Sequence, residues 1–404
     1  MMKKNFVLAI LIFLGCSTHE SSTTKTELNP VVLKSTVIDL TNLKQVIDGF
    51  GAATVWNGQL SDQEMDLAFL NGPGQLGLTI CRIRFDPNGN DTHEILNSRK
   101  AKERGAIILA SVWSPPPKMK NNDSVVGGSI KDSSFGEYAS WLSNNRVKFG
   151  NVDIVSIQNE PNIEVNYESC SWTKEQILNF CKNYANKIGG NVMIPECYNF
   201  DVSYSDLVLN NPTASYNINY IGGHIYGSSP FYYSNAIAKG KKVWMTEHYY
   251  DPDDIQTCLN MAKEISDCMY YHMNAYVWWY LKEVKCNLID SKGNIKKKGY
   301  IMAQFSKFVR PGYHRVHTIY NMAQGVYFTA YKGDKMVLII VNKNNYPVSF
   351  NISFQNGIVK NFTKYVTSAV KNLKKEEDVV LVTNNSLNAV VDALSVTTFV
   401  ETDL

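Results

Sequence analysis

Between residues 45 and 310, short apolar runs alternate with segments whose apolar positions recur at helical spacing. This alternation is typical of α/β architecture with parallel strands, in which a helix covers each buried strand. The eight runs are Val46–Val55, Leu78–Phe85, Ala106–Val112, Val152–Gln158, Val192–Pro195, Ile218–Ile225, Lys242–Thr246 and Asn274–Tyr280. Eight consecutive units predict a closed (β/α)8 TIM barrel over residues 45–310.

Helix-start signals support this interpretation. Ser61 precedes one helical pattern with Glu64 three residues later, and the segment Trp172–Ile188 also begins with capping chemistry. An open doubly wound sheet is the alternative, but the chain has no glycine-rich nucleotide fingerprint to favour it.

The pattern changes to strand-like alternation after Pro311. Strands are predicted at Val326–Tyr331, Met336–Asn342, Val348–Phe354, Val379–Val382 and Ser395–Val400. Residues 31–44 have a similar pattern and precede the barrel. We therefore expect a side β-sandwich built from residues 31–44 together with residues 311–404.

Composition and charge narrow the classes of function. The formal net charge is +3, and Lys3 and Lys4 contribute two of these charges, which leaves 3 − 2 = +1. Without a basic patch, we expect no nucleic-acid partner. Aromatic residues make up 12% of the chain, with 23 Tyr and 7 Trp. Most aromatic residues serve core packing, but flat aromatic faces beside polar groups also suit sugar rings.

The first residues have the pattern of an export signal. An apolar run, Phe6–Leu14, follows a basic start and is too short to span a membrane. It ends in Leu-Gly-Cys at Cys16, which resembles a bacterial lipoprotein signal, although Phe13 departs from that pattern. We expect a signal peptide over residues 1–15, a lipidated Cys16 and a polar tether over residues 16–30. Lipid would anchor the protein at the outer membrane, on the cell surface or the periplasmic face; an ordinary secretory signal and a secreted protein are the alternative.

Beyond Cys16 the chain has seven cysteines, an odd number that cannot pair completely. They show no CxxC or Cys/His spacing of the kind that binds zinc, so we expect no metal ion. The sequence does not decide between scattered disulfides and free thiols. We also expect no cofactor and a monomeric chain that contacts the membrane only through its lipid.

Glutamates follow two of the predicted barrel strands. The fourth run leads into Asn159-Glu160-Pro161, and the seventh leads into Glu247. Active sites of such barrels gather at the C-terminal strand ends, so these carboxyl groups should face each other. A glycoside hydrolase needs one carboxyl group to protonate the leaving oxygen and a second to attack the sugar or activate water. A lone glutamate at a strand end is more often a helix cap or a surface charge, so the pair carries this prediction.

Arg82 is expected to support the nucleophile. A charge-assisted hydrogen bond from Arg82, or alternatively from Arg84, would keep Glu247 ionised while Glu160 holds its proton.

Several motifs strengthen the glycosidase prediction because they follow one another in a fixed order. They are Val46-Ile47-Asp48-Gly49-Phe50-Gly51-Ala52, Ser156-Ile157-Gln158-Asn159-Glu160-Pro161, Trp244-Met245-Thr246-Glu247-His248-Tyr249-Tyr250, Ala275-Tyr276-Val277-Trp278-Trp279-Tyr280 and Phe305-Ser306-Lys307-Phe308-Val309-Arg310-Pro311-Gly312-Tyr313. This series resembles glycoside hydrolase family 30, and within it the glucuronoxylanase-type xylanases.

The resemblance implies a retaining endo-β-1,4-xylanase whose partners are xylan or xylooligosaccharides. Glu160 would be the acid/base and Glu247 the nucleophile. Sugar contacts would come from Trp56, Trp113, Asn159, Trp172, His224, Tyr226, Tyr249, Trp278 and Tyr280. For Trp279, strand alternation predicts the face opposite to that of Trp278.

One loop departs from the family pattern. Glucuronoxylanases of this type bind a glucuronate branch with an arginine-containing loop after the eighth strand, but here that loop reads Leu281-Lys282-Glu283-Val284-Lys285-Cys286-Asn287. A lysine lacks the bidentate fork of arginine, and Glu283 would repel a carboxylate. We therefore expect a xylanase without strict glucuronate dependence.

Three alternatives stay open. Two are other enzymes, a glucuronoxylan-specific xylanase and another family 30 β-glycosidase of the β-1,6-glucanase or glucosylceramidase kind. The third, more distant, is a glycan-binding lipoprotein without turnover, against which the presence of both glutamates argues.

Overall fold

The computed structural model describes residues 31–32, 35–282 and 285–403. The predicted signal peptide, the tether and Cys16 lie outside the described residues. Within these ranges, no helix has the length and apolar character needed to cross a membrane.

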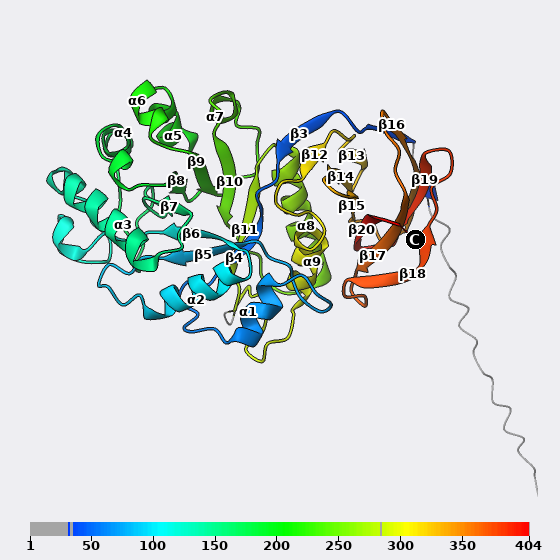
Figure 1. Ribbon diagram of the computed structural model, residues 1–404, viewed down its shortest axis with the longest axis horizontal. Helices are drawn as coiled ribbons and strands as arrows, with labels where there is room; N and C mark the ends of the chain where they lie inside the picture. The colour runs from blue at the N-terminus through cyan, green and yellow to red at the C-terminus, as the bar shows by residue number, and fades with distance from the viewer. Residues whose placement is uncertain (1–30, 33–34, 283–284, 404) are drawn as a thin grey trace, which may run out of the picture.

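Eight parallel strands close into a barrel, as predicted (Figure 1). They are β4 (Gly49–Ala53), β5 (Ile80–Arg84), β6 (Ile107–Ser111), β7 (Ile154–Ser156), β8 (Asn191–Cys197), β9 (Tyr220–His224), β10 (Lys242–Glu247) and β11 (Ala275–Tyr280). The last strand pairs with the first, with Ala275 opposite Gly49, so the sheet has no open edge. The open doubly wound sheet is therefore excluded.

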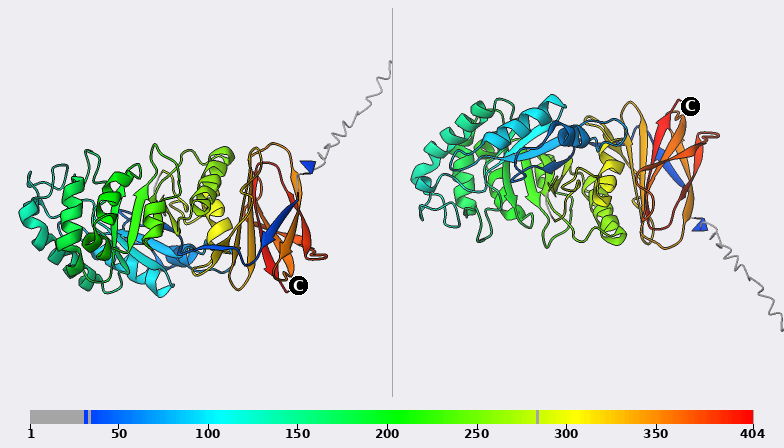
Figure 2. Two further views of the ribbon diagram at one scale, coloured as in Figure 1. Left: turned by 90° about the horizontal axis from the view of Figure 1, so that it is seen from above. Right: turned by 90° about the horizontal axis from the view of Figure 1, so that it is seen from below.

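Helices between the strands surround this barrel (Figures 1 and 2). They are α1 (Asp62–Phe69), α2 (Thr92–Glu103), α3 (Phe135–Phe149), α4 (Lys174–Asn183), α5 (Val202–Leu209), α6 (Pro212–Tyr216), α7 (Ser234–Ala238), α8 (Ile255–Tyr270) and α9 (Lys297–Ser306). Complete capping boxes begin α1, at Ser61 with Glu64, and α4, at Thr173 with Gln176. Each box satisfies backbone N–H groups that the first helical turn leaves unpaired.

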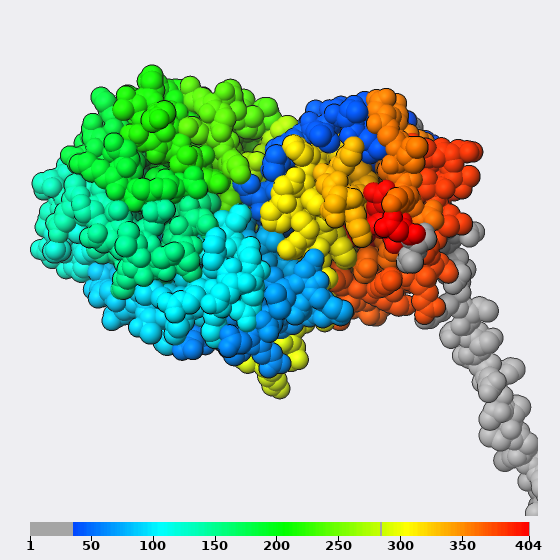
Figure 3. Space-filling view, viewed as in Figure 1, coloured from blue at the N-terminus to red at the C-terminus, as the bar shows by residue number. Residues whose placement is uncertain are grey.

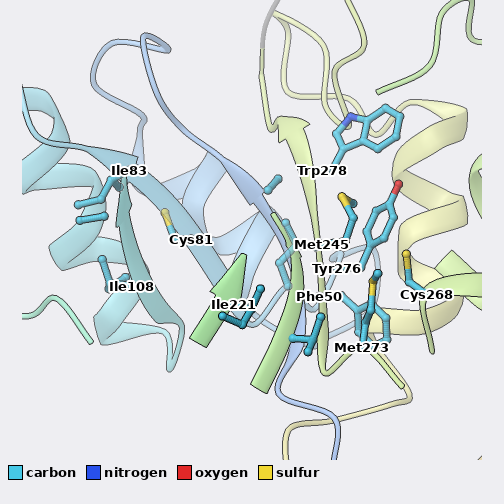
Figure 4. Close-up of a cluster of buried hydrophobic side chains, with 14 of the residues drawn as sticks. Phe50, Cys81, Ile83, Ile108, Ile221, Met245, Cys268, Met273, Tyr276 and Trp278 are labelled. Carbon is cyan, nitrogen blue, oxygen red and sulfur yellow. The ribbon is translucent and has the colours of Figure 1, made fainter. Parts of the chain in front are cut away.

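Alternation along each barrel strand separates an inner from an outer set of side chains. Ile80 contacts inward residues of other strands, including Leu109 and Trp244, in one small apolar cluster. Cys81 and Ile83 belong instead to the large core between the strands and the helices, part of which Figure 4 shows. Because successive residues of a strand face opposite sides, Arg82 then points into the barrel.

Two further sheets form the side β-sandwich beside the barrel (Figures 1 and 2). One sheet contains β1 (Val31–Val32), β2 (Thr36–Asp39), β16 (Val348–Gln355) and β19 (Ser386–Val391). The other contains β3 (Leu43–Val46), β12 (His314–Val316), β13 (Asn321–Ala323), β14 (Val326–Lys332), β15 (Met336–Asn342), β17 (Asn361–Thr367), β18 (Lys374–Val380) and β20 (Ser395–Thr402). Strands from before the barrel, β1 to β3, and from after it, β12 to β20, both contribute to the sandwich.

The central strand β15 of the larger sheet is buried on both of its faces. Along β15 every residue is buried, which explains its unbroken apolar sequence. Leu338 and Ile340 pack into the sandwich core, whereas Val337 and Ile339 join the core of the barrel and its helices. The larger sheet of the sandwich therefore packs directly against the barrel and its helices, and the space-filling view shows the two parts in contact (Figure 3).

Candidate active site

Glu160 lies just beyond the end of β7, in a left-handed backbone conformation with φ +48°. Non-glycine residues adopt this conformation at a cost and often at functional sites. Neighbouring strand ends hold the turn. The Glu160 amide donates to the Glu196 carbonyl at 2.9 Å, and the Asn159 amide donates to the Val112 carbonyl at 2.6 Å.

Glu247 ends β10, and a bulge determines its direction. Trp244 faces the barrel interior, so regular alternation would turn Glu247 outward. The pairing of β10 with β9 shifts register between Met245 and Glu247, where one extra residue is accommodated. Such a bulge re-aims the side chain that follows it, and here it brings the carboxylate into the barrel mouth.

The two glutamates meet at the C-terminal end of the barrel. One oxygen of Glu160, one of Glu247 and a ring nitrogen of His224 all lie within 4.8 Å of one another. Carboxyl groups about 5–5.5 Å apart are typical of retaining glycosidases, and a separation of about 6.5–9.5 Å is typical of inverting ones. The short spacing favours direct attack on the sugar, because it leaves no room for a water molecule between carboxylate and substrate.

Arg82 organises the floor of the site, as the sequence predicted. Its Nη1 donates to Glu247 Oε2 at 2.6 Å, and its Nη2 donates to Asn159 Oδ1 at 2.7 Å. Nε donates to Ser111 Oγ at 3.0 Å, and Nη2 also lies 3.1 Å from Glu196 Oε1. The guanidinium is fully buried, so these partners replace its water shell.

Glu196 and His224 complete the charged cluster. Burial alone would raise the pKa of Glu196, but the charges of Arg82 and His224 lower it to about 2. Burial alone would lower the pKa of His224, yet its three carboxylate neighbours, Glu247 among them, raise it to about 9. His224 Nδ1 lies 2.9 Å from Glu160 Oε1, so a protonated imidazole faces the predicted acid/base.

Opposing influences act on Glu247 itself. Burial raises the pKa of Glu247 above its ordinary value, and the positive charges of His224 and Arg82 reduce this rise without cancelling it. The Tyr226 hydroxyl donates to Glu247 Oε1 at 3.1 Å. Because burial and the neighbouring Glu247 charge raise the pKa of Tyr226 well above its ordinary value, this hydroxyl remains a donor.

A cleft of 510 Å³ opens above the two glutamates. Its wall is largely aromatic, which suits the apolar faces of sugar rings. It is lined by Trp56, Trp113, Glu160, Tyr167, Tyr198, Tyr226, Glu247, Tyr249, Trp279 and Tyr280. Five of the predicted sugar contacts therefore lie on the cleft: Trp56, Trp113, Tyr226, Tyr249 and Tyr280. Asn159 and His224 are buried beneath it, in contact with Arg82 and Glu160.

Two predicted contacts, Trp172 and Trp278, lie in the core instead. Trp172 stacks on Phe135 at 5.4 Å, and its indole N–H donates to Gln158. Trp278 is fully buried in the core between strands and helices, close to Tyr276 in Figure 4. Trp279 takes the place on the cleft that the sequence analysis gave to Trp278.

The phase of alternation along β11 explains this correction. Ala275 and Val277 fill the barrel interior with residues of other strands, so Tyr276 and Trp278 must point outward to the helices. The predicted alternation between Trp278 and Trp279 was right, but its phase was wrong by one residue.

Sequence reasoning missed three further residues of the site. Glu196 directly follows the fifth predicted strand, Val192–Pro195, so the strand-end rule used for Glu160 and Glu247 could have found it. Tyr198 follows two residues later and stacks on Tyr226 at 5.0 Å. No sequence pattern marks Tyr167, because it lies in the loop after β7 and not at a strand end. Only the folded structure brings its hydroxyl to 3.4 Å from Glu160 Oε2.

The seven cysteines after Cys16 are buried free thiols, so the structure contains no disulfide among them.

Glu160, His224 and Glu247 have the mutual spacing of metal ligands. Their ion pairs with one another and with Arg82 account for that spacing, and the adjacent guanidinium disfavours a cation. A carboxylate pair in an aromatic cleft is the arrangement that glycoside hydrolysis requires.

Comparison with known proteins identifies the family. No family model matches the chain. A glucuronoxylanase of Bacillus subtilis strain 168, XynC, is 36% identical over 383 residues, which cover 88% of this chain and 89% of the relative. The crystal structure of Xyn30A, a glycoside hydrolase family 30 subfamily 8 xylanase from Clostridium acetobutylicum, superposes with a TM-score of 0.87 at 37% identity, over 91% of this chain and 99% of that one. A family 30 endoxylanase from Clostridium papyrosolvens C71 gives a TM-score of 0.83 at 36% identity, with coverages of 91% and 99%. The chain belongs to glycoside hydrolase family 30.

The adjacent tryptophans of β11 provide a matched test of the corrected placement. Trp279→Ala removes part of the cleft wall and should lower kcat/KM about tenfold while leaving stability nearly unchanged. Trp278→Ala empties a core position and should lower the free energy of unfolding by about 3–5 kcal/mol. Denaturant titration and kinetics on both variants separate these effects. If Trp278→Ala mainly lowered activity and Trp279→Ala mainly lowered stability, the placement of Trp279 on the cleft would be wrong.

Proposed function

We propose that the protein is a retaining endo-β-1,4-xylanase that hydrolyses the xylan backbone by double displacement, without strict dependence on a glucuronate branch. The carboxylate spacing of at most 4.8 Å in an aromatic cleft carries the proposal. The named activities of the three relatives supply the substrate class.

In the first step, Glu247 attacks the anomeric carbon while Glu160 gives its proton to the glycosidic oxygen. The bond to the leaving chain breaks and a covalent glycosyl-enzyme forms. Arg82 and Tyr226 hold the Glu247 carboxylate in position for the attack. When Glu160 loses its proton, the protonated His224 2.9 Å away stabilises the new carboxylate.

In the second step, water occupies the place of the departed chain. Glu160, now a base, takes a proton from this water as its oxygen attacks the anomeric carbon, and the bond to Glu247 breaks. Two inversions leave the product with the stereochemistry of the substrate, and Glu160 again holds a proton.

Azide rescue distinguishes the two glutamates. Glu247→Ala should lower kcat by at least about four orders of magnitude, because no other carboxylate can attack. Glu160→Ala should lower it about 10²–10⁴-fold. On an aryl xylobioside, azide should restore turnover in both variants, giving an α-glycosyl azide with Glu247→Ala and a β-glycosyl azide with Glu160→Ala. NMR of the products checks this, and the reverse stereochemistry would exchange the two roles.

The cleft's charged groups support the weaker glucuronate dependence. Arg82 is committed to Glu247 and Glu196. Arg84 is paired with Asp86 and with both oxygens of Glu168. In the loop after β11, Lys282 is paired with Glu64 on α1. Arg82, Arg84 and Lys282 are therefore not available to a branch carboxylate. Lys285 of the same loop is exposed, but a lysine cannot form the bidentate contact of an arginine.

The branch requirement is measured by comparing substrates. We expect kcat/KM on glucuronoxylan to be within about tenfold of that on unbranched xylooligosaccharides, since one exposed charge contact contributes about 1 kcal/mol or less. Products should show no fixed branch position. A preference of several hundredfold, with every product branched at one position, would instead favour the glucuronoxylan-specific alternative.

Export and lipid attachment at Cys16 belong to the same proposal. The apolar run Phe6–Leu14 ahead of Cys16 supports a lipoprotein signal, and a surface anchor would suit an enzyme whose polymeric substrate cannot enter the cell. Mass spectrometry of the mature protein should find a diacylglyceryl-modified Cys16 at its N-terminus. An unmodified N-terminus beyond Cys16 would favour simple secretion.

A further inference from the structure

A second and larger hollow lies outside the catalytic cleft. It has a volume of 750 Å³ and is formed where α8 meets the sandwich strands β13 and β14 (Figure 1). Four tyrosines and two amide side chains line it: Tyr270, Tyr271, Tyr320, Tyr327, Asn321 and Gln324. We refer to it as the junction groove.

The tyrosines of the junction groove form a continuous aromatic surface. Tyr270 stacks on Tyr320, with ring centroids 4.3 Å apart and planes 14° from parallel. Tyr327 follows at 5.6 Å from Tyr320. Tyr270, Tyr271 and Tyr327 are only partly buried, although residues of this size gain most from complete burial.

The charges of the junction groove balance within it. Lys263 pairs with Asp267 at 2.5 Å, and its ammonium also lies 4.9 Å from the centre of the Tyr327 ring. Asp267 in turn accepts from the Tyr320 hydroxyl. A groove with balanced charges does not select an anionic ligand, and its many polar groups do not suit a lipid. Aromatic faces beside neutral amides and hydroxyls fit an uncharged saccharide.

A smaller hollow adjoins the junction groove. Its volume is 190 Å³, and it shares Ser229, Pro230, Lys263 and Asp267 with the junction groove. It is also lined by Tyr250 and Glu264, so the hollowed surface extends beyond the junction groove along α8.

We propose that the junction groove is a second binding site for the neutral β-1,4-linked xylan backbone, separate from the cleft in which cleavage occurs. It would hold a polymer on the enzyme between successive cuts. The proposal rests on the proposed xylanase function, because the groove's own chemistry specifies a neutral saccharide and the catalytic site specifies which one.

The experiment compares polymer binding with cleavage of short substrates. In an inactive Glu247→Gln background, the double substitution Tyr271→Ala and Gln324→Ala should weaken binding to insoluble xylan about tenfold in a depletion assay. In the otherwise wild-type enzyme, the same double substitution should leave kcat/KM on short soluble xylooligosaccharides within twofold. Tyr216→Ala is the matched control, since Tyr216 is 87% exposed at the end of α6 and lies outside the groove.

Two results would overturn the proposal, and they can be told apart. If the double variant bound insoluble xylan as well as its parent while cleavage of short xylooligosaccharides was intact, the junction groove would not be a second binding site. The proposed xylanase function would be unaffected. Failure of the wild-type enzyme to cleave xylooligosaccharides would contradict the xylanase function and with it the groove's ligand. Should the double variant fold poorly by circular dichroism, the exposed Asn321→Ala alone replaces it, with a smaller loss of binding expected.

Discussion

The buried ion pair between Arg82 and Glu247 is the interaction on which the active site depends. A guanidinium without water contact is stable only among negative or strongly polar partners. Arg82 therefore requires Glu247 and Glu196, and these carboxylates in turn are stable only beside it. With Glu160 protonated, the positive charges of Arg82 and His224 match the negative charges of Glu196 and Glu247. In the proposed mechanism the catalytic cycle begins from this balanced state and keeps it, because Glu247 loses its negative charge to the covalent bond as Glu160 gains one.

Regular periodicity made most of the barrel predictable. All eight strands lie within or beside the apolar runs, and the capping boxes at Ser61 and Thr173 mark true helix starts. The sandwich was harder to predict. Only the last residues of β18 (Lys374–Val380) were predicted as a strand. The strand is exposed and begins with consecutive charged residues, which hide the apolar alternation of a strand. β19 alternates buried and exposed positions over only six residues, too few to distinguish from the loops around it.

The proximity of Glu160 and Glu247 was predictable because each glutamate follows a strand, and the family resemblance implied their proposed roles. The positions of the neighbouring aromatic residues were not predictable, because a tryptophan near a strand end fits either the cleft or the core. The choice between Trp278 and Trp279 depends on one residue of phase, and only the inward packing of Ala275 and Val277 decides it. Trp172 was misplaced for a similar reason, because its stacking partner Phe135 belongs to α3, which lies much earlier in the sequence.

The pairing of β2 with β16 has a consequence for how the chain must assemble. Thr36 lies opposite Ile352, and Asp39 lies opposite Gln355, so these partners are more than 300 residues apart. All the barrel strands lie between β2 and β16 in the sequence, so β2 gains this partner only after the whole barrel has been synthesised. Formation of this sandwich sheet must therefore follow synthesis of the barrel.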